Sequence, residues 1–177
     1  GQEQAIRRAY ERAGVDPSTV TLVEGHGTGT PVGDAVELTA LKNVLGEGEA
    51  RESDPRRQRV AVGSIKSNIG HLKAVAGCAG LVKVVLALKH KVLPQTINVS
   101  IPPKLRDGTT IQESALYINT QRRPWFTRPG LPRRAGVSSF GFGGANYHCV
   151  VEEYETEHSD RSRPYRVHAL PVPVLLA

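Results

Sequence analysis

The sequence predicts an α/β fold, because two segments repeat the order of a short apolar strand, a polar loop and a helix. In the first, "TVTLVEG" at 19–25 is followed by a helical pattern of apolar residues. In the second, "RVAVGSIKS" at 59–67 is followed by a helix from about Leu72 through "AVAGCAGLVKVVLALKH". Strands that alternate with helices favour a parallel sheet covered by helices.

Both helices of these units carry signals of their position. Asp34 is a suitable N-terminal cap for the first helix, whose apolar face would consist of Ala35, Leu38, Leu41 and Leu45. The second helix is rich in small residues, namely Ala74, Ala76, Gly77, Ala79 and Gly80. Small residues allow close approach to another backbone, so we expect this helix in the interior.

Other elements complete the pattern. An amphipathic helix from Ile6 to Ala13 should end at Gly14. A short strand is expected near Tyr117 to Asn119, and two more strands, "RRAGVSS" and "NYHCVVEE", are joined by "FGFGGA". The charged segment from Gly46 to Gln58 is expected to be a surface loop, and the stretch from Glu155 on a linker.

Composition limits the class of protein. The chain has 177 residues, 39% of them hydrophobic, which suits one ordinary globular domain. No apolar stretch reaches the roughly 18 residues that span a bilayer, and the longest, "LVKVVLAL", contains Lys83. The polar start lacks the apolar core of a secretory signal, and two cysteines are too few for a disulfide framework. These features predict a soluble, cytoplasmic protein with no membrane partner.

The net charge of +6 raises the question of a nucleic-acid partner. The arginines occur mostly as short groups in predicted loops, at 51–59, 122–123, 133–134 and 161–163. Few aromatic residues lie between them to stack on bases, and no groove-reading helix or metal finger is visible. The charge pattern therefore favours an acidic protein partner over nucleic acid.

Two histidines occupy matched positions after the two predicted parallel strands. His26 opens "HGTGTPVGD" and His71 ends "KSNIGH". A lone histidine is more often structural than functional, but the carboxyl ends of parallel strands meet at one edge of a sheet, where ligands bind. We therefore expect the two loops to converge on one site.

Three motifs in this order resemble the carboxyl-terminal half of a β-ketoacyl synthase, the condensing domain of fatty-acid and polyketide synthases. They are "EGHGTGTPVGDAVE", "VGSIKSNIGHLKAVAGCAGLVKVVLAL" and "AGVSSFGFGGANYHCVVEE". The connection "HKVLPQTINV" with "SALYINTQRRPW" is most similar to the iterative multidomain synthases of polyunsaturated fatty acids and enediyne polyketides.

The resemblance implies a thiolase-like fold, of which this chain would form the carboxyl-terminal half of the αβαβα layers. Residues 1–153 would belong to the ketosynthase, and 154–177 to a linker toward a following acyltransferase domain. The implied partners are the amino-terminal half of the same ketosynthase, an acyl carrier protein, the acyltransferase domain and, in the intact enzyme, a second copy in a homodimer.

The resemblance also implies a reaction and its residues. Such enzymes load an acyl chain onto a cysteine, decarboxylate carrier-bound malonyl, and join the resulting carbanion to the acyl group. His26 and His71 would stabilise the enolate by hydrogen bonding. Lys66 would have an electrostatic and organising role, and Glu37 lies where the family carries a carboxylate that could pair with that lysine.

Further residues would receive the substrate. Thr28 and Thr30 match positions that bind the phosphopantetheine arm of the carrier, although their hydroxyls could equally satisfy turn backbone. Phe142 would be a gate whose backbone N–H completes an oxyanion hole, and Gly141, Gly143 and Gly144 would give its loop freedom. The alternative for this loop is a tight hairpin with a core phenylalanine. No metal and no directly bound cofactor is implied.

No residue of this chain matches the family's nucleophilic cysteine, which precedes these motifs. Cys78 and Cys149 lie in apolar runs and are expected to be inert small hydrophobic residues. "CAG" at Cys78 has the letters of a thiolase motif, but its mid-helix context does not fit that class. The chain should therefore be inactive without its amino-terminal half. A ketosynthase-like module that docks the carrier or sets chain length, without catalysis, remains the alternative.

Overall fold

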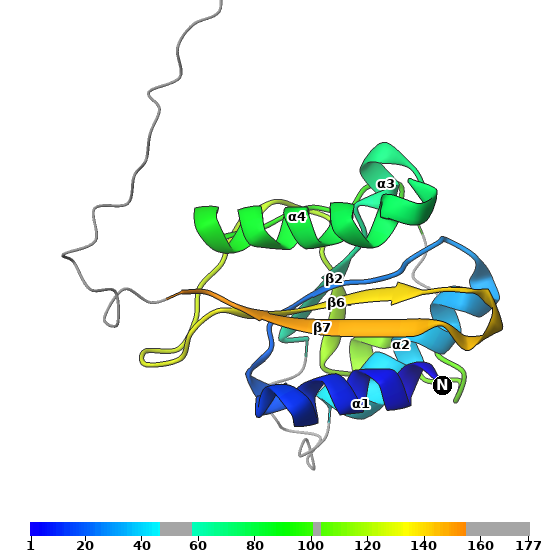
Figure 1. The fold of residues 1–177 in the computed structure, drawn as a ribbon, viewed down its shortest axis with the longest axis horizontal. Helices are drawn as coiled ribbons and strands as arrows, with labels where there is room; N and C mark the ends of the chain where they lie inside the picture. The colour runs from blue at the N-terminus through cyan, green and yellow to red at the C-terminus, as the bar shows by residue number, and fades with distance from the viewer. Residues whose placement is uncertain (47–57, 101–103, 155–177) are drawn as a thin grey trace, which may run out of the picture.

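A computed structural model describes residues 1–46, 58–100 and 104–154, which form three layers (Figure 1). A five-stranded sheet in the order β4-β2-β1-β6-β7 lies between helices α1 and α2 on one face and helices α3 and α4 on the other. The predicted α/β class is thus confirmed. Most of the predicted loop from Gly46 to Gln58, namely residues 47–57, and the linker from residue 155 lie outside the described residues.

Four strands of the sheet are parallel: β1 (Leu22–Glu24), β2 (Val60–Gly63), β4 (Leu116–Ile118) and β6 (Arg134–Phe140). Strand β7 (Asn146–Glu152) returns antiparallel to β6. A separate antiparallel pair joins β3 (Val92–Leu93) to β5 (Arg123–Pro124). The predicted strand near Tyr117 exists and is shifted by one residue.

The sheet separates two apolar cores, because successive side chains of a strand point to opposite faces. Val23 of β1 packs toward α1 and α2, in a cluster with Ile6, Leu38, Leu41 and Leu45. The neighbouring Leu22 joins the opposite cluster, which contains Val84, Ala87 and Leu88 of α4 and the buried Trp125. Central strands buried on both faces explain the continuous apolar runs of the sequence.

The first two helices differ in how well the sequence predicts their ends. Helix α1 (Gln2–Ala13) ends as predicted at Gly14, whose φ of 62° is a left-handed conformation that glycine adopts without strain. Helix α2 (Pro31–Leu45) begins three residues before Asp34, so the predicted cap is wrong. Proline suits the first helical position and moves the N-cap to Thr30. The Asp34 carboxylate instead accepts the Gly29 N–H at 3.2 Å.

Helix α4 (Ala76–His90) follows the short helix α3 (Lys66–Ile69) and a 3₁₀ turn at Lys73–Val75. Its sheet-facing side packs closely, since a Cβ at Gly80 would lie 2.9 Å from Cγ of Glu24. The prediction that α4 is interior holds for this side only. The opposite side exposes a stripe of apolar residues, defined here as the α4 outer stripe: Leu81, Val82, Val85 and Leu86. The five-stranded sheet covers only one side of the helix.

The remaining short elements are 3₁₀ turns at Pro17–Thr19, Ile111–Glu113 and Phe142–Gly144. Across the described ranges, no helix has the length and apolar character needed to cross a membrane.

Candidate active site

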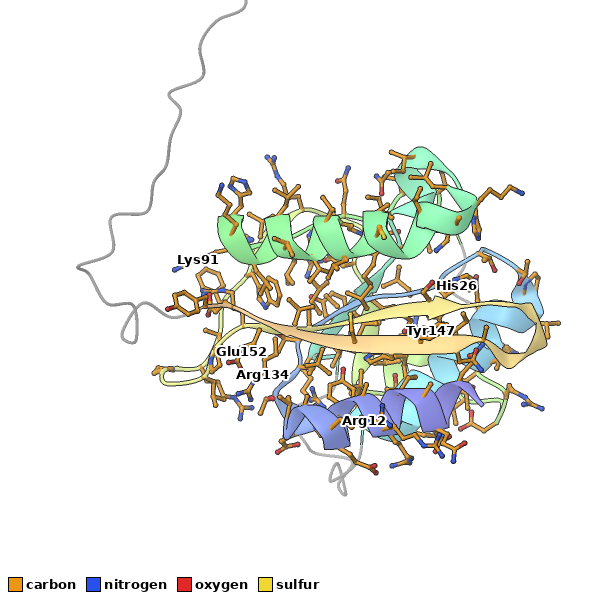
Figure 2. All side chains as sticks on the ribbon, in the orientation of Figure 1. Arg12, His26, Lys91, Arg134, Tyr147 and Glu152 are labelled. Atoms are coloured by element: carbon orange, nitrogen blue, oxygen red, sulfur yellow. The ribbon has the colours of Figure 1, made fainter. Side chains whose placement is uncertain are left out.

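Three loops meet at the carboxyl ends of the adjacent parallel strands β2, β1 and β6. His26 follows β1, His71 lies after α3, and Phe140 ends β6. The ring centroids of His26 and His71 are 6.0 Å apart with an interplanar angle of 85°, and the Phe140 ring is 5.9 Å from that of His26. Figure 2 places His26 at the carboxyl end of β6. The predicted convergence of the two histidine loops is confirmed.

The backbone orients the His71 ring and selects its tautomer. Nδ1 of His71 accepts the Lys73 N–H at 3.0 Å. A neutral imidazole carries one N–H, so the proton of the neutral ring resides on Nε2. The His71 side chain is exposed, so this Nε2–H is available as a hydrogen-bond donor.

His26 is more enclosed than His71. Burial, followed by the positive charge of Lys66 and by His71, lowers the pKa of His26, which favours its neutral form. Among the described residues, its buried Nδ1 has no hydrogen-bond partner. Leaving such a buried polar atom unpaired costs about 1–3 kcal/mol.

The peptide unit between His26 and Gly27 is bound at both ends. Its C=O accepts the Lys66 ammonium at 2.6 Å, and its N–H donates to Oε2 of Glu37 at 2.9 Å. Oε1 of Glu37 accepts the His26 N–H at 2.7 Å. Lysine and carboxylate thus fix the backbone that carries the His26 ring.

The expected direct pairing of Glu37 with Lys66 is wrong, since no ion pair joins the two within the part of the chain that the structure describes. The peptide unit lies between them and binds both. Glu37 is buried rather than exposed, and burial raises its pKa against the opposing effect of the Gly27 and His26 N–H groups. Burial likewise lowers the pKa of Lys66.

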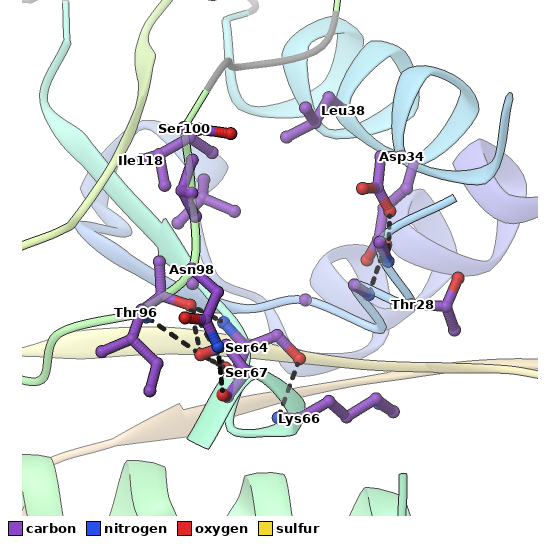
Figure 3. A pocket seen from close by; sticks show the side chains of 18 residues that line it. Thr28, Asp34, Leu38, Ser64, Lys66, Ser67, Thr96, Asn98, Ser100 and Ile118 are labelled. Atoms are coloured by element: carbon purple, nitrogen blue, oxygen red, sulfur yellow. Dashed lines mark hydrogen bonds between the residues drawn. The ribbon is translucent and has the colours of Figure 1, made fainter. Parts of the chain in front are cut away.

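Thr28 and Thr30 are exposed, with their hydroxyl oxygens 3.4 Å apart. Thr28 lines a cavity of about 350 Å³ together with Ser64, Ser67 and Thr96 (Figure 3). Thr30 and the two histidines are not among its lining residues. The cavity therefore lies beside the histidine pair and does not contain it.

A hydroxyl network in this cavity was not predicted from the sequence. Thr96 Oγ1 donates to the Ser64 carbonyl at 3.2 Å and lies 2.9 Å from Ser67 Oγ (Figure 3). Asn98 Nδ2 approaches the Ser67 carbonyl at 3.4 Å. These contacts join the segment after β3 to the start of α3, which carries Lys66, and no spacing in the sequence indicates them.

In the glycine loop after β6, only some of the glycines have the backbone conformations that favour glycine. Gly143 and Gly144 have φ of 77° and 87°, values that favour glycine. Gly141 has an ordinary extended conformation, with φ of −120°, and its N–H donates to the Ala145 carbonyl at 2.8 Å. The expected freedom thus holds at two of three glycines. The side chain of Phe142, the expected gate, lies outside the described part.

A buried ion pair was also not predicted from the sequence. Glu24 at the end of β1 is only 3% exposed, and its Oε2 lies 2.6 Å from Nζ of Lys83 on α4. Its Oε1 accepts the Ile65 N–H at 2.6 Å. The one feature of the sequence that could have indicated this ion pair is Lys83, a lysine inside the apolar run "LVKVVLAL".

A second unpredicted group surrounds His148 on β7. Its Nδ1 lies 3.0 Å from Ser138 Oγ and its Nε2 lies 3.3 Å from the Tyr10 hydroxyl. A Cβ at Gly136 would lie 2.7 Å from the His148 ring, so glycine makes room for this contact. Burial lowers the pKa of His148 to about 4. Its bonds to Ser138 and Tyr10 indicate a structural histidine.

That both cysteines are inert stays a prediction, but the apolar runs that contain them do not enclose them. Cys78 and Cys149 are free and exposed. Cys78 lies on α4 beside the α4 outer stripe, on the side of the helix that faces outward. An apolar run in the sequence therefore does not imply that its residues are buried by the part of the chain that the structure describes.

Sequence comparison assigns the family. Residues 1–100 match the family described as "Beta-ketoacyl synthase, C-terminal domain", and residues 107–177 match "Ketoacyl-synthetase C-terminal extension". The chain therefore belongs to the β-ketoacyl synthase family, within its carboxyl-terminal domain.

Named relatives agree with this assignment. The chain is 66% identical over 176 residues to a polyunsaturated fatty acid synthase of Thraustochytrium sp., covering 99% of this chain and 6% of that protein. It is 46% identical to polyketide synthase PksL of Bacillus subtilis, covering 85% of this chain and 3% of that protein. The predicted resemblance to multidomain synthases is confirmed.

A solved structure that matches is the ketosynthase from module 6 of the bacillaene synthase of Bacillus subtilis. The TM-score is 0.76 at 46% identity, covering 88% of this chain and 27% of the solved chain. This likeness confirms the thiolase-like ketosynthase fold. The chain thus spans only a small part of the proteins that it resembles.

Proposed function

We propose that this chain supplies the decarboxylation machinery of a ketosynthase that condenses carrier-bound malonyl with an enzyme-bound acyl thioester. The observation that carries the proposal is the pair of imidazoles, 6.0 Å apart, at the meeting point of three loops. The His71 ring presents an N–H outward, and the lowered pKa of His26 favours a second uncharged ring beside it.

This pair suits the first chemical step. When the malonyl carbon–carboxylate bond breaks, CO₂ leaves and the bonding electrons move onto the thioester as an enolate. N–H groups from His26 and His71 would donate to the enolate oxygen, where the negative charge develops. The enolate carbon would then attack the acyl thioester carbon, and the nucleophilic cysteine would leave as a thiolate.

Other residues would support this step. Lys66 and Glu37 would keep the His26 peptide unit in place before substrate arrives, so that no reorganisation is needed in the transition state. Thr28 and Thr30 would contact the phosphopantetheine arm of the carrier from their exposed loop. The loop at Gly141 and Phe142 would provide the gate and the oxyanion N–H for the acyl thioester.

The partners follow from the same proposal. The amino-terminal half would bring the cysteine and cover the α4 outer stripe, since a set of apolar residues exposed together marks an interaction surface. An acyl carrier protein would deliver malonyl. An acyltransferase domain would follow the linker at 154–177, and the intact ketosynthase would act as a homodimer.

The function is tested in the complete ketosynthase domain by measuring CO₂ release and carbon–carbon bond formation from malonyl-carrier and an acylated enzyme. We expect both products, and neither when the amino-terminal half is omitted. CO₂ release and condensation both absent from a folded, carrier-binding domain would overturn the proposal in favour of a docking module.

Labelling of Cys78 tests whether the amino-terminal half covers the outer side of α4. In the complete domain we expect an alkylating reagent to label Cys78 at least about tenfold more slowly than in denaturant, because the amino-terminal half shields the thiol. Mass spectrometry of the Cys78 peptide, in a Cys149→Ser background, gives both rates. Equally fast labelling would show that the outer side of α4 stays open and would contradict this arrangement.

A further inference from the structure

Lys83 occupies an unusual place for a charged residue. It lies in the middle of the apolar helix α4, with its side chain 11% exposed, and pairs with a glutamate 3% exposed. Burying two charges is expensive, and apolar replacements of a buried pair are often neutral or stabilising. Stability alone is therefore a weak reason for an ion pair here.

The pair is connected to the segments that carry the proposed decarboxylation site. Glu24 is two residues before His26 and is the last residue of β1. Its second carboxylate oxygen accepts the N–H of Ile65, which immediately precedes Lys66. The Lys66 ammonium in turn donates to the His26 carbonyl. The end of β1 with the following His26 and the start of α3 are thus joined twice, once by the Glu24 side chain and once by the Lys66 side chain.

Helix α4 completes this connection. Gly80, one turn before Lys83, allows the helix to approach until a Cβ there would lie 2.9 Å from Glu24 Cγ. The Lys83 ammonium then reaches Oε2 and leaves Oε1 for the Ile65 N–H. A single buried carboxylate, compensated by one ammonium, therefore links β1, the start of α3 and α4.

We propose that Glu24 and Lys83 are positioning residues for decarboxylation, which set the placement of the His26 loop relative to the start of α3, where Lys66 lies, through the Ile65 N–H. This inference rests on the proposed function. Lys83 acts by compensating the Glu24 charge, so that the carboxylate accepts both hydrogen bonds at once. Neither residue contacts substrate.

The test compares Lys83→Met, Glu24→Gln and the double variant in the complete ketosynthase domain. Either single change leaves one uncompensated buried charge, so we expect the malonyl decarboxylation kcat to fall about tenfold to a hundredfold, a range typical of small misplacements. KM for malonyl and acylation of the nucleophilic cysteine should stay within about twofold. The double variant should recover at least about tenfold over Lys83→Met, because the glutamine side chain that Glu24→Gln introduces carries no charge but can still accept the Ile65 N–H.

Lys89→Met, an exposed lysine in the last turn of the same helix, is the matched control and should behave as wild type. Decarboxylation by Lys83→Met equal to that of Lys89→Met would overturn the inference. If Lys83→Met does not fold, recovery of folding and decarboxylation in the double variant supports charge compensation, and failure to recover overturns it. The His26→Ala variant separates the two proposals, since a wild-type rate in that variant would refute the proposed function itself.

Discussion

Replacing His26 or His71 by alanine in the complete ketosynthase is expected to slow malonyl decarboxylation by about a hundredfold to a thousandfold. Each ring would donate one of the two hydrogen bonds to the enolate oxygen, and alanine removes that donor. Acylation of the upstream cysteine should remain measurable, because attack on the acyl thioester requires a different set of atoms. The two half-reactions are measured separately, as CO₂ release and as acyl-enzyme by mass spectrometry.

Two further variants sharpen this prediction. His71→Gln keeps an N–H donor at the end of a side chain of similar length, so it should retain more activity than His71→Ala. His90→Ala, at the exposed end of α4, removes a histidine far from the pair and should leave both half-reactions unchanged. Loss of acylation with normal decarboxylation in both alanine variants would remove His26 and His71 from the proposed role.

The sequence supported a correct prediction of the histidine pair because its position follows from topology. His26 comes two residues after β1, and His71 follows β2 after the short helix α3. Neighbouring parallel strands bring the segments that follow them together. The order of strands and helices could also be predicted from the sequence, because the periodicity of apolar residues is a local property of each segment. The resemblance to the family motifs supplied expected roles for individual residues, which local sequence patterns cannot provide.

The contacts that organise the site were less visible, because they depend on side chains that are distant in sequence. Glu24 and Lys83 are 59 positions apart, and nothing near either residue indicates the other. The pairing of Glu37 with Lys66 was wrong for a related reason. Sequence placed two opposite charges near one loop but did not show that the His26 peptide unit lies between them.

Burial was also hard to predict from the sequence. Apolar runs predicted an interior α4, yet burial is a property of everything that packs around a segment. One side of α4 meets the sheet, and the outer stripe has no cover among the described residues. A hydrophobic pattern therefore indicates what must be covered, while the covering element can lie elsewhere in a larger protein.

His148 predicts a pH-dependent loss of stability that is independent of the catalytic pair. The ordinary pKa of histidine is 6.5, and burial lowers that of His148 to about 4 in the folded chain. The fold therefore favours the neutral ring, which lies between Ser138 and Tyr10. A depressed histidine pKa contributes stability above pH 6.5 that is lost as the pH falls toward 4.

The size of this effect follows from the shift between the two pKa values. One pKa unit corresponds to about 1.4 kcal/mol, so the full loss is about 3 kcal/mol, of which about 2 kcal/mol should be lost by about pH 5. His148→Gln does not titrate, so the stability difference between wild type and this variant should shrink by about that amount between about pH 7.5 and pH 5.

Urea unfolding of the complete domain at several pH values measures this difference. The pKa of His26 is also lowered, but His26 is present in both proteins, so its contribution cancels in the comparison. A difference that stays constant across this range would mean that His148 is not held neutral by the fold.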